Sequence, residues 1–219
     1  MSDYIFQFVA GRLCLDYLNT LGDRGADSPS EHLTDYAELI RWTLEAGAIH
    51  EDTARALLRE GRGHPAASRR VLLRARRVRE AMYGIFSAAR KKQRPAKLDL
   101  VLLNRELGSA LANARIEVGD DAFQLGWTDA AAELDRPLWP VLRSAADLLA
   151  GGELSRIKAC ASHSCEWVFM DESRNRSRQW CQMEVCGNRA KARRHYARAR
   201  SSKPGGRRDS RQSRKEMKQ

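Results

Sequence analysis

Apolar residues recur at helical spacing through most of the first 150 positions of the chain. From His32 to Ala46, and again from about Ala67 to Lys92, apolar side chains fall three or four positions apart, which is typical of amphipathic helices. Thr34 or Ser30 is expected to cap the first of these helices, and Gly47 to end it. The same pattern predicts further helices over residues 13–21, 50–61, 96–114 and 138–149.

One segment follows the period of a strand instead. Apolar and polar residues alternate on either side of a turn at residues 119–121, which predicts a β-hairpin. The alternating apolar positions are Ile116, Val118, Phe123 and Leu125. A Gly-Gly pair at 151–152 then ends the last helix. We therefore expect a mainly α fold, with a helical N-terminal domain over residues 1–152 that contains one β-hairpin.

The helix predicted from about Ala67 to Lys92 has a basic face opposite its apolar stripe. We interpret this face as solvated, although it could also contact nucleic acid. Its members are Arg69, Arg70, Arg74, Arg76, Arg77 and Arg79.

Four of the five cysteines lie in two matched C-x₄-C pairs, and fifteen residues separate the pairs. The fifth, Cys14, lies in an apolar helical run and is expected to be a small buried residue. The paired cysteines are Cys160, Cys165, Cys181 and Cys186. Four thiols in two close pairs match the tetrahedral ligand set of a structural Zn²⁺ ion. We therefore expect one structural zinc, in a finger that spans residues 153–200.

The same cysteines could instead form disulfides, a redox site or an iron–sulfur cluster, and the first two of these fit the spacing or the cellular compartment less well. Structural disulfides are rare in a reducing compartment, and a redox dithiol would favour C-x-x-C. An iron–sulfur cluster also takes four thiolates, and His163 could replace one cysteine as a ligand. About thirty residues bury too little apolar area to fold alone, so a metal would supply the missing stability.

The fifteen-residue spacer suits a small hairpin between the two cysteine pairs. Trp167-Val168-Phe169 is strand-like, and Gln179-Trp180 is expected to pair back on it across a polar turn. The result would be a small treble-clef-like zinc finger with four cysteine ligands, followed by a basic C-terminal helix and tail. Cys186 is expected in the first turn of that helix, and Tyr196 is expected to pack against the hairpin.

The net charge of +11 is confined to the C-terminal end of the chain. Residues 1–186 contain 26 Lys and Arg against 26 Asp and Glu, whereas residues 187–219 contain 13 basic and two acidic residues. A localised excess of this kind indicates a polyanionic partner. The helix is expected to end near Arg200, followed by a basic disordered tail over residues 201–219.

Side chains near the second cysteine pair and in the spacer turn could bind nucleic acid. Amide and guanidinium groups read bases or bind phosphates, and a rigid basic helix fits a groove. The candidates are Asn188, Arg189, Lys191, Arg193, Arg194, Arg198, Arg174, Arg176 and Arg178.

Several strings resemble a known bacterial architecture. "CASHSC", "WVFMDESRNRSRQWC" and "CGNRAKARRHYARAR" resemble the CGNR zinc finger, and "RLCLDYLNT" and "LDRPLWPVLRSAADLL" resemble the ABATE domain that usually precedes it. Together they cover about residues 4–200. The resemblance implies that the four paired cysteines are zinc ligands, that Gly187, Asn188 and Arg189 belong to the family signature, and that the protein is a stress-induced transcription regulator with a DNA-binding finger.

These features lead us to expect a zinc-dependent, DNA-binding transcription regulator that is not an enzyme. The finger helix and the tail would contact duplex DNA, while the N-terminal domain would sense a signal, through an unknown small-molecule effector, or form a homodimer. Two alternatives remain open. The protein could bind RNA or the ribosome, with Trp167, Phe169 or Tyr196 stacking on bases, or the N-terminal domain could bind a small molecule and use the finger to dock a protein.

The chain shows no sign of a membrane partner. No hydrophobic run reaches the roughly 18 residues that a membrane span needs, and the N-terminus lacks the pattern of a secretory signal. We expect a cytoplasmic, nucleoid-associated protein.

Overall fold

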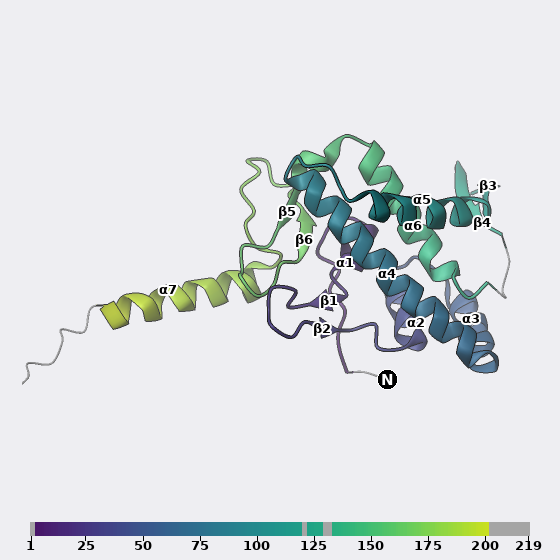
Figure 1. Ribbon diagram of the computed structural model, residues 1–219, viewed down its shortest axis with the longest axis horizontal. Coiled ribbons are helices and arrows are strands. Elements are labelled where there is room, and N and C mark those ends of the chain that lie inside the picture. Colours follow the sequence, from purple (N-terminus) through teal and green to yellow (C-terminus); the bar gives the residue numbers. More distant parts are fainter. Residues whose placement is uncertain (1–2, 120–121, 129–132, 202–219) are drawn as a thin grey trace, which may run out of the picture.

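The computed structural model describes residues 3–119, 122–128 and 133–201 (Figure 1). Its helices are α1 (Leu13–Leu18), α2 (Tyr36–Glu45), α3 (Glu51–Gly63), α4 (Pro65–Arg90), α5 (Lys97–Leu111), α6 (Trp139–Ala150) and α7 (Asn188–Ser201). Its strands are β1 (Leu21–Gly22), β2 (Ser30–Glu31), β3 (Ala114–Val118), β4 (Phe123–Trp127), β5 (Ile157–Ala159) and β6 (Val168–Met170). The predicted mainly α fold is confirmed. The predicted tail lies outside the described residues, except for Ser201, which ends α7.

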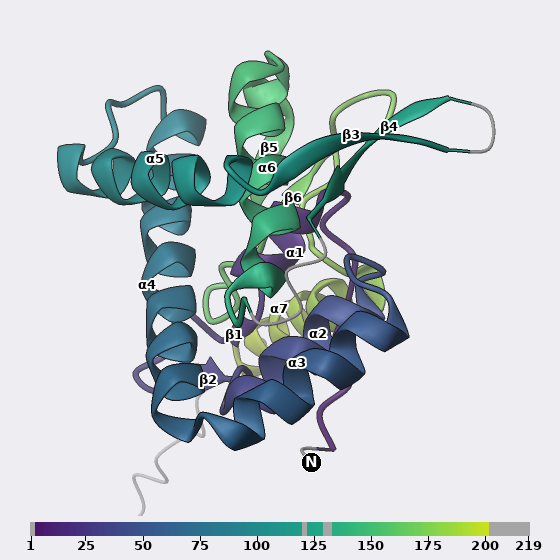
Figure 2. The ribbon, with the colours of Figure 1, turned by 90° about the vertical axis from the view of Figure 1, so that its right-hand side faces the viewer.

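Helix α4 is the element against which most of the other helices pack. Helices α1, α2, α3 and α5 all contact it, and α6 packs against both α1 and α5. The predicted hairpin is confirmed: β3 and β4 pair antiparallel from Ala114 opposite Trp127 to Val118 opposite Phe123. This hairpin follows α5 and projects beyond the helices (Figure 2).

Several predicted helix ends are wrong. The helices predicted over residues 13–21 and 96–114 end at Leu18 and Leu111, because Leu21 and Ala114 belong to strands β1 and β3. Two further ends differ for a local reason. Helix α2 begins at Tyr36, because the Asp35 carboxylate caps it by accepting a 2.9 Å hydrogen bond from the backbone nitrogen of Glu38. Thr34 and Ser30 therefore do not cap it. Helix α3 continues past Gly61, where a β-carbon would lie 2.8 Å from the Tyr36 ring. Gly61 is thus a point of close helix packing.

The predicted solvated arginine face of α4 is only partly correct. Arg69, Arg70 and Arg77 are exposed, but the Arg79 side chain is 2% exposed and forms a two-point ion pair with Glu31. Arg76 donates to the carbonyl of Leu33, and Arg74 pairs with Glu106 and Asp135. A buried guanidinium group is stable only when paired, which accounts for the ion pair of Arg79 with Glu31. The three arginines together connect the β1–β2 region, α5 and the segment before α6 to α4.

One hydrophobic core runs through both halves of the chain. Leu15, Trp42 and Phe86 in the helical segment belong to the same buried cluster as Val168 and Phe169 in the cysteine segment. Cys14 is fully buried in it, as predicted. Among the described helices, none combines the length and the apolar character needed to cross a membrane.

Candidate metal centre and basic helix

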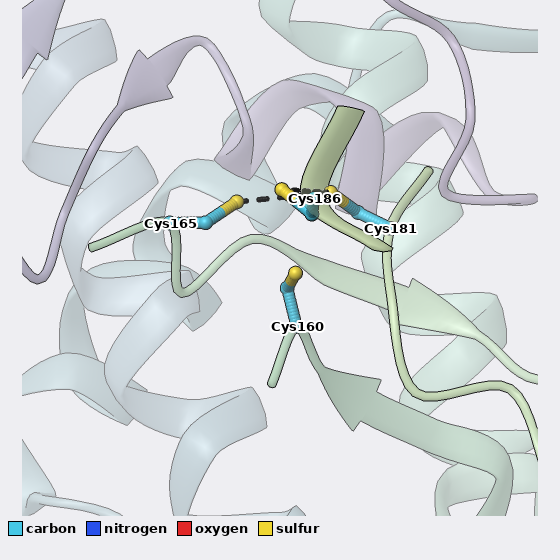
Figure 3. A group of neighbouring side chains, drawn as sticks. All are labelled: Cys160, Cys165, Cys181 and Cys186. Atoms are coloured by element: carbon cyan, nitrogen blue, oxygen red, sulfur yellow. Dashed lines mark hydrogen bonds between the residues drawn. The ribbon is translucent and has the colours of Figure 1, made fainter. Parts of the chain in front are cut away.

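The four paired cysteines converge on one point. Cys160 follows β5, Cys165 closes the turn after it, Cys181 ends the spacer and Cys186 lies in a π-helical turn, Met183–Gly187, that leads into α7. All four sulfur atoms lie within 4.8 Å of one another and all four residues are buried. Figure 3 shows the side chains pointing toward a common centre.

The spacing of these sulfur atoms matches tetrahedral coordination of one ion. The Cys165 and Cys181 sulfurs are 3.7 Å apart, and those of Cys181 and Cys186 are 3.6 Å apart. A tetrahedral site with Zn–S bonds of about 2.3 Å places sulfurs roughly 3.8 Å apart, whereas a disulfide requires about 2.05 Å. A cluster of several irons would hold the sulfurs further apart. The geometry therefore fits one structural zinc, and the exposed His163 is not part of the group.

The four cysteines are close enough that each thiol changes the pKa of its neighbours. Hydrogen bonds from Cys165 and Cys181 lower the pKa of Cys160, and interactions with Cys160 and Cys165 raise the pKa of Cys181. Four thiolates within 4.8 Å of one another would repel one another strongly without a cation between them. A bound zinc ion would displace the thiol protons and stabilise four thiolates, so metal binding would stabilise the fold of the finger.

The predicted hairpin inside the spacer is wrong, because the strand that contains Val168 and Phe169 pairs with a different segment from the one expected. Strand β6 pairs antiparallel with β5, which precedes the first cysteine pair, and Ile157 lies opposite Met170. Gln179, the predicted partner of β6, is not in a strand; its backbone carbonyl accepts a 2.8 Å hydrogen bond from the backbone nitrogen of Ala161. The sheet therefore begins before the first cysteine, because β5 continues the chain directly out of the helical segment and lies beside β6.

Asp171 organises the loop between the two cysteine pairs. Its buried carboxylate accepts hydrogen bonds from Lys158, from the backbone nitrogen of Arg178 and from both the backbone nitrogen and the hydroxyl of Ser173. Burial alone would raise the pKa of Asp171, but the hydrogen bonds from Lys158 and Ser173 outweigh it and lower the pKa below its ordinary value. Sequence reasoning missed this residue, although an Asp two positions before Ser is a typical side-chain-to-backbone turn.

Arg178 belongs to this internal network and not to a nucleic-acid surface. Its guanidinium donates to the backbone carbonyls of Val9, Trp180 and Cys181 and lies over the Phe169 ring, 4.2 Å from the ring centroid. These contacts use most of its donors, so the prediction that Arg178 contacts nucleic acid is wrong. Arg174 and Arg176 are exposed in the same loop, which lies at the same end of the molecule as α7 (Figure 1).

Helix α7 starts at the metal centre and extends away from the rest of the molecule (Figure 1). Cys186, which was predicted in the first turn of this helix, lies in the π-helical turn directly before it, and Ala190 packs inward with 7% exposure. Tyr196 is 68% exposed, so the prediction that it packs against the hairpin is wrong: the helix carries it beyond the finger. The remaining predicted contact residues on this helix, all exposed, are Asn188, Arg189, Lys191, Arg193, Arg194 and Arg198.

Two aromatic residues of the finger, Trp167 and Phe169, are buried in its interior. Trp167 is 9% exposed and donates its indole N–H to the carbonyl of Leu21, and Phe169 is fully buried. Neither can stack on a base in this fold. Of the three aromatic residues considered for stacking, only Tyr196 is accessible.

Four buried cysteines placed to hold one ion, at the start of an exposed basic helix, define a zinc finger attached to a helical domain. The chain belongs to the ABATE family, described as "Putative stress-induced transcription regulator", whose model matches residues 11–152. Residues 156–199 match the CGNR zinc finger. The predicted resemblance is therefore confirmed for both segments. A search of the curated proteins gives no match to the chain.

Proposed function

We propose that this protein is a transcription regulator that binds duplex DNA through its zinc finger. The observation that carries the proposal is the position of α7: it begins directly after the turn that carries the metal-centre residue Cys186, and its exposed side chains from Asn188 to Arg198 include five basic residues and no acidic one. A rigid helix with this charge matches the phosphate backbone of a nucleic acid. Arg174 and Arg176 would extend the contact, together with the basic tail.

Salt dependence tests the electrostatic part of this proposal. If about five phosphates are neutralised, raising salt from ~50 to ~200 mM should weaken binding to a short duplex several hundred-fold. Fluorescence anisotropy with a labelled duplex measures this directly. An affinity that hardly changes over that range would contradict the proposal.

A pair of matched variants tests where the DNA binds. Replacing Arg193 and Arg194 on α7 with Gln should weaken binding strongly. Replacing Arg70 and Arg77, which are also exposed arginines but lie on α4, should leave it nearly unchanged. Equal losses in both double variants would mean that α7 is not the binding surface.

The same assay separates DNA from RNA. The burial of Trp167 and Phe169 removes most of the stacking surface that single-stranded RNA recognition uses, so we propose DNA as the partner. Competition with a structured RNA should displace the duplex poorly. Tighter binding of the RNA would favour the alternative, a zinc protein that binds RNA or the ribosome.

For the N-terminal domain, residues 1–152, we propose a role in sensing an effector or in forming a homodimer, and no catalysis. A cavity of about 500 Å³ beside the metal centre supports sensing, because both segments line it: Tyr4 and His32 from the N-terminal segment, and Glu184 and Arg189 from the finger, together with the metal-centre residues Cys165, Cys181 and Cys186. An occupant would touch the first turn of α7. Ligands that raise the melting temperature of the full chain, but not of a Tyr4→Ala variant, would support this site, and equal shifts in both proteins would contradict it.

A further inference from the structure

The side chains of α7 divide into distinct stripes along the helix. Successive residues of an α-helix are rotated by about 100°, so Asn188, Ala192 and His195 lie within about 60° of one another. Ala190 points almost the opposite way, and its burial against the finger marks that side as the inner one. The stripe of Asn188, Ala192 and His195 is therefore the outer face, and all three residues are exposed.

Two basic stripes flank this outer face. Each is centred about 100° from it, one on either side. The first consists of Lys191, Arg194 and Arg198, and the second of Arg189, Arg193 and the exposed Tyr196. The outer face itself is small and weakly polar at its centre, since Ala192 carries only a methyl group.

This distribution is what a helix needs to lie deep in a groove. The major groove of B-DNA is about 12 Å wide and admits one α-helix. A small side chain at the centre of the leading face lets the helix backbone approach the bases, while long cationic side chains on both flanks reach the phosphates of the two strands. A helix that bound only one strand would need its charge on one side.

We propose that α7 lies lengthwise in the major groove, with Asn188, Ala192 and His195 facing the base edges and the two flanking stripes on opposite phosphate backbones. This inference rests on the proposed function. The Asn188 amide nitrogen donates one hydrogen to the Glu184 carbonyl at 2.9 Å, which leaves its second hydrogen and its oxygen to pair with adenine. The Ala192 methyl group matches the methyl group of thymine. Ala192 is thus the residue whose size determines whether bases are read.

Two substitutions of the same kind on opposite faces test this arrangement. Ala192 and Ala197 are both exposed and lie roughly 140° apart on the helix, and leucine has a helix propensity close to that of alanine. A duplex enriched from a random pool by the full-length zinc-loaded protein serves as the specific probe, and a scrambled duplex of the same composition serves as the non-specific one. Zinc content and circular dichroism confirm that both variants fold.

Ala192→Leu should weaken binding to the enriched duplex by about tenfold or more, the range of one lost base contact, and change binding to the scrambled duplex less than about twofold. Ala197→Leu should change neither. Equal losses in the two variants, or a pool that yields no enriched sequence although the protein binds duplex DNA, would overturn the inference and leave the proposed function intact. No salt-sensitive binding to any duplex would instead overturn the proposed function and, with it, this inference.

Discussion

Asn19 in the helical segment pairs with the backbone of Val168 in the zinc finger through both atoms of its side-chain amide. Its nitrogen donates to the Val168 carbonyl at 2.9 Å, and its oxygen accepts from the Val168 nitrogen at 3.0 Å. Asn19 is 3% exposed and Val168 is 1% exposed. The amide thus takes the place of a neighbouring strand beside β6 and fixes the finger to α1.

Replacing Asn19 with alanine should destabilise the whole chain. The change leaves a buried backbone donor and acceptor without partners, and each such loss costs about 1–3 kcal/mol. Urea denaturation should show a free energy of unfolding lower by about 2–5 kcal/mol. Asn104→Ala, at an exposed position on α5, is the control and should change it by less than about 0.5 kcal/mol. A similar small effect at Asn19 would mean that the finger is not held through this pair.

Loss of the Asp171 carboxylate should loosen the loop that carries Arg174 and Arg176. In an Asp171→Ala variant, Lys158 and the backbone nitrogens of Ser173 and Arg178 lose their shared acceptor. Limited trypsin digestion should then cleave after Arg174 or Arg176 at least several times faster than in the wild type. Glu172→Ala removes only an exposed ion pair with Arg12, which contributes little, so cleavage should stay slow. Equal rates in all three proteins would refute the role of Asp171.

The buried carboxyl group of Asp16 should make stability depend on pH in the mildly acidic range. Burial raises the pKa of Asp16 to about 6, against hydrogen bonds from the backbone nitrogens of Ala10 and Val9 and the charge of Arg178, which lower it. Because the folded pKa lies above the ordinary value of 3.8, the folded state favours the protonated form. The stabilisation is fully present below about pH 4 and is lost as the pH rises to about 6.

The comparison with Asp16→Asn isolates this effect from the protonation of the cysteines, which both proteins share. The difference in free energy of unfolding, wild type minus variant, should fall by about 2–3 kcal/mol between pH 4 and pH 7. A difference that is constant with pH would show that the Asp16 pKa is not raised. A difference that grows with pH would show that it is lowered.

Each of the four paired cysteines should be needed for the metal. Cys181→Ser removes a ligand whose sulfur lies 3.7 and 3.6 Å from those of Cys165 and Cys186, so the variant should bind zinc far more weakly and lose the fold of the finger. Cys14→Ser is the control: Cys14 is buried in the core away from this group, so the variant should keep one zinc per chain. Full zinc occupancy in Cys181→Ser would show that the ligand set is wrong.

The parts of this structure that depend on local patterns could be predicted from the sequence. The cysteine spacing identified the metal centre, and periodicity located α4, α6 and the β3–β4 hairpin, because apolar spacing reports directly which face is buried. The resemblance of the two segments to known families was also correct. What failed was pairing between distant residues. The pairing of β5 with β6 and the contact of Asn19 with Val168 cannot be recognised from the local sequence around any one of these residues.

Charged residues were harder to place than apolar ones. Arg79 and Arg178 look like their exposed neighbours in the sequence, yet one is buried against Glu31 and the other binds backbone carbonyls inside the finger. An arginine is buried only where partners from elsewhere in the chain meet it, and periodicity does not report those partners. Tyr196 shows the opposite error, since an aromatic residue was expected to pack although the helix carries it into solvent.

The most direct measurement is the affinity of the full chain for duplex DNA before zinc is removed, after removal with a chelator and after zinc is restored. The predicted result is one zinc per chain at the start, a loss of binding by about a hundredfold or more when the first turn of α7 loses its anchor, and recovery with zinc. A metal-free protein that binds the duplex as tightly as the zinc-loaded one would contradict the account.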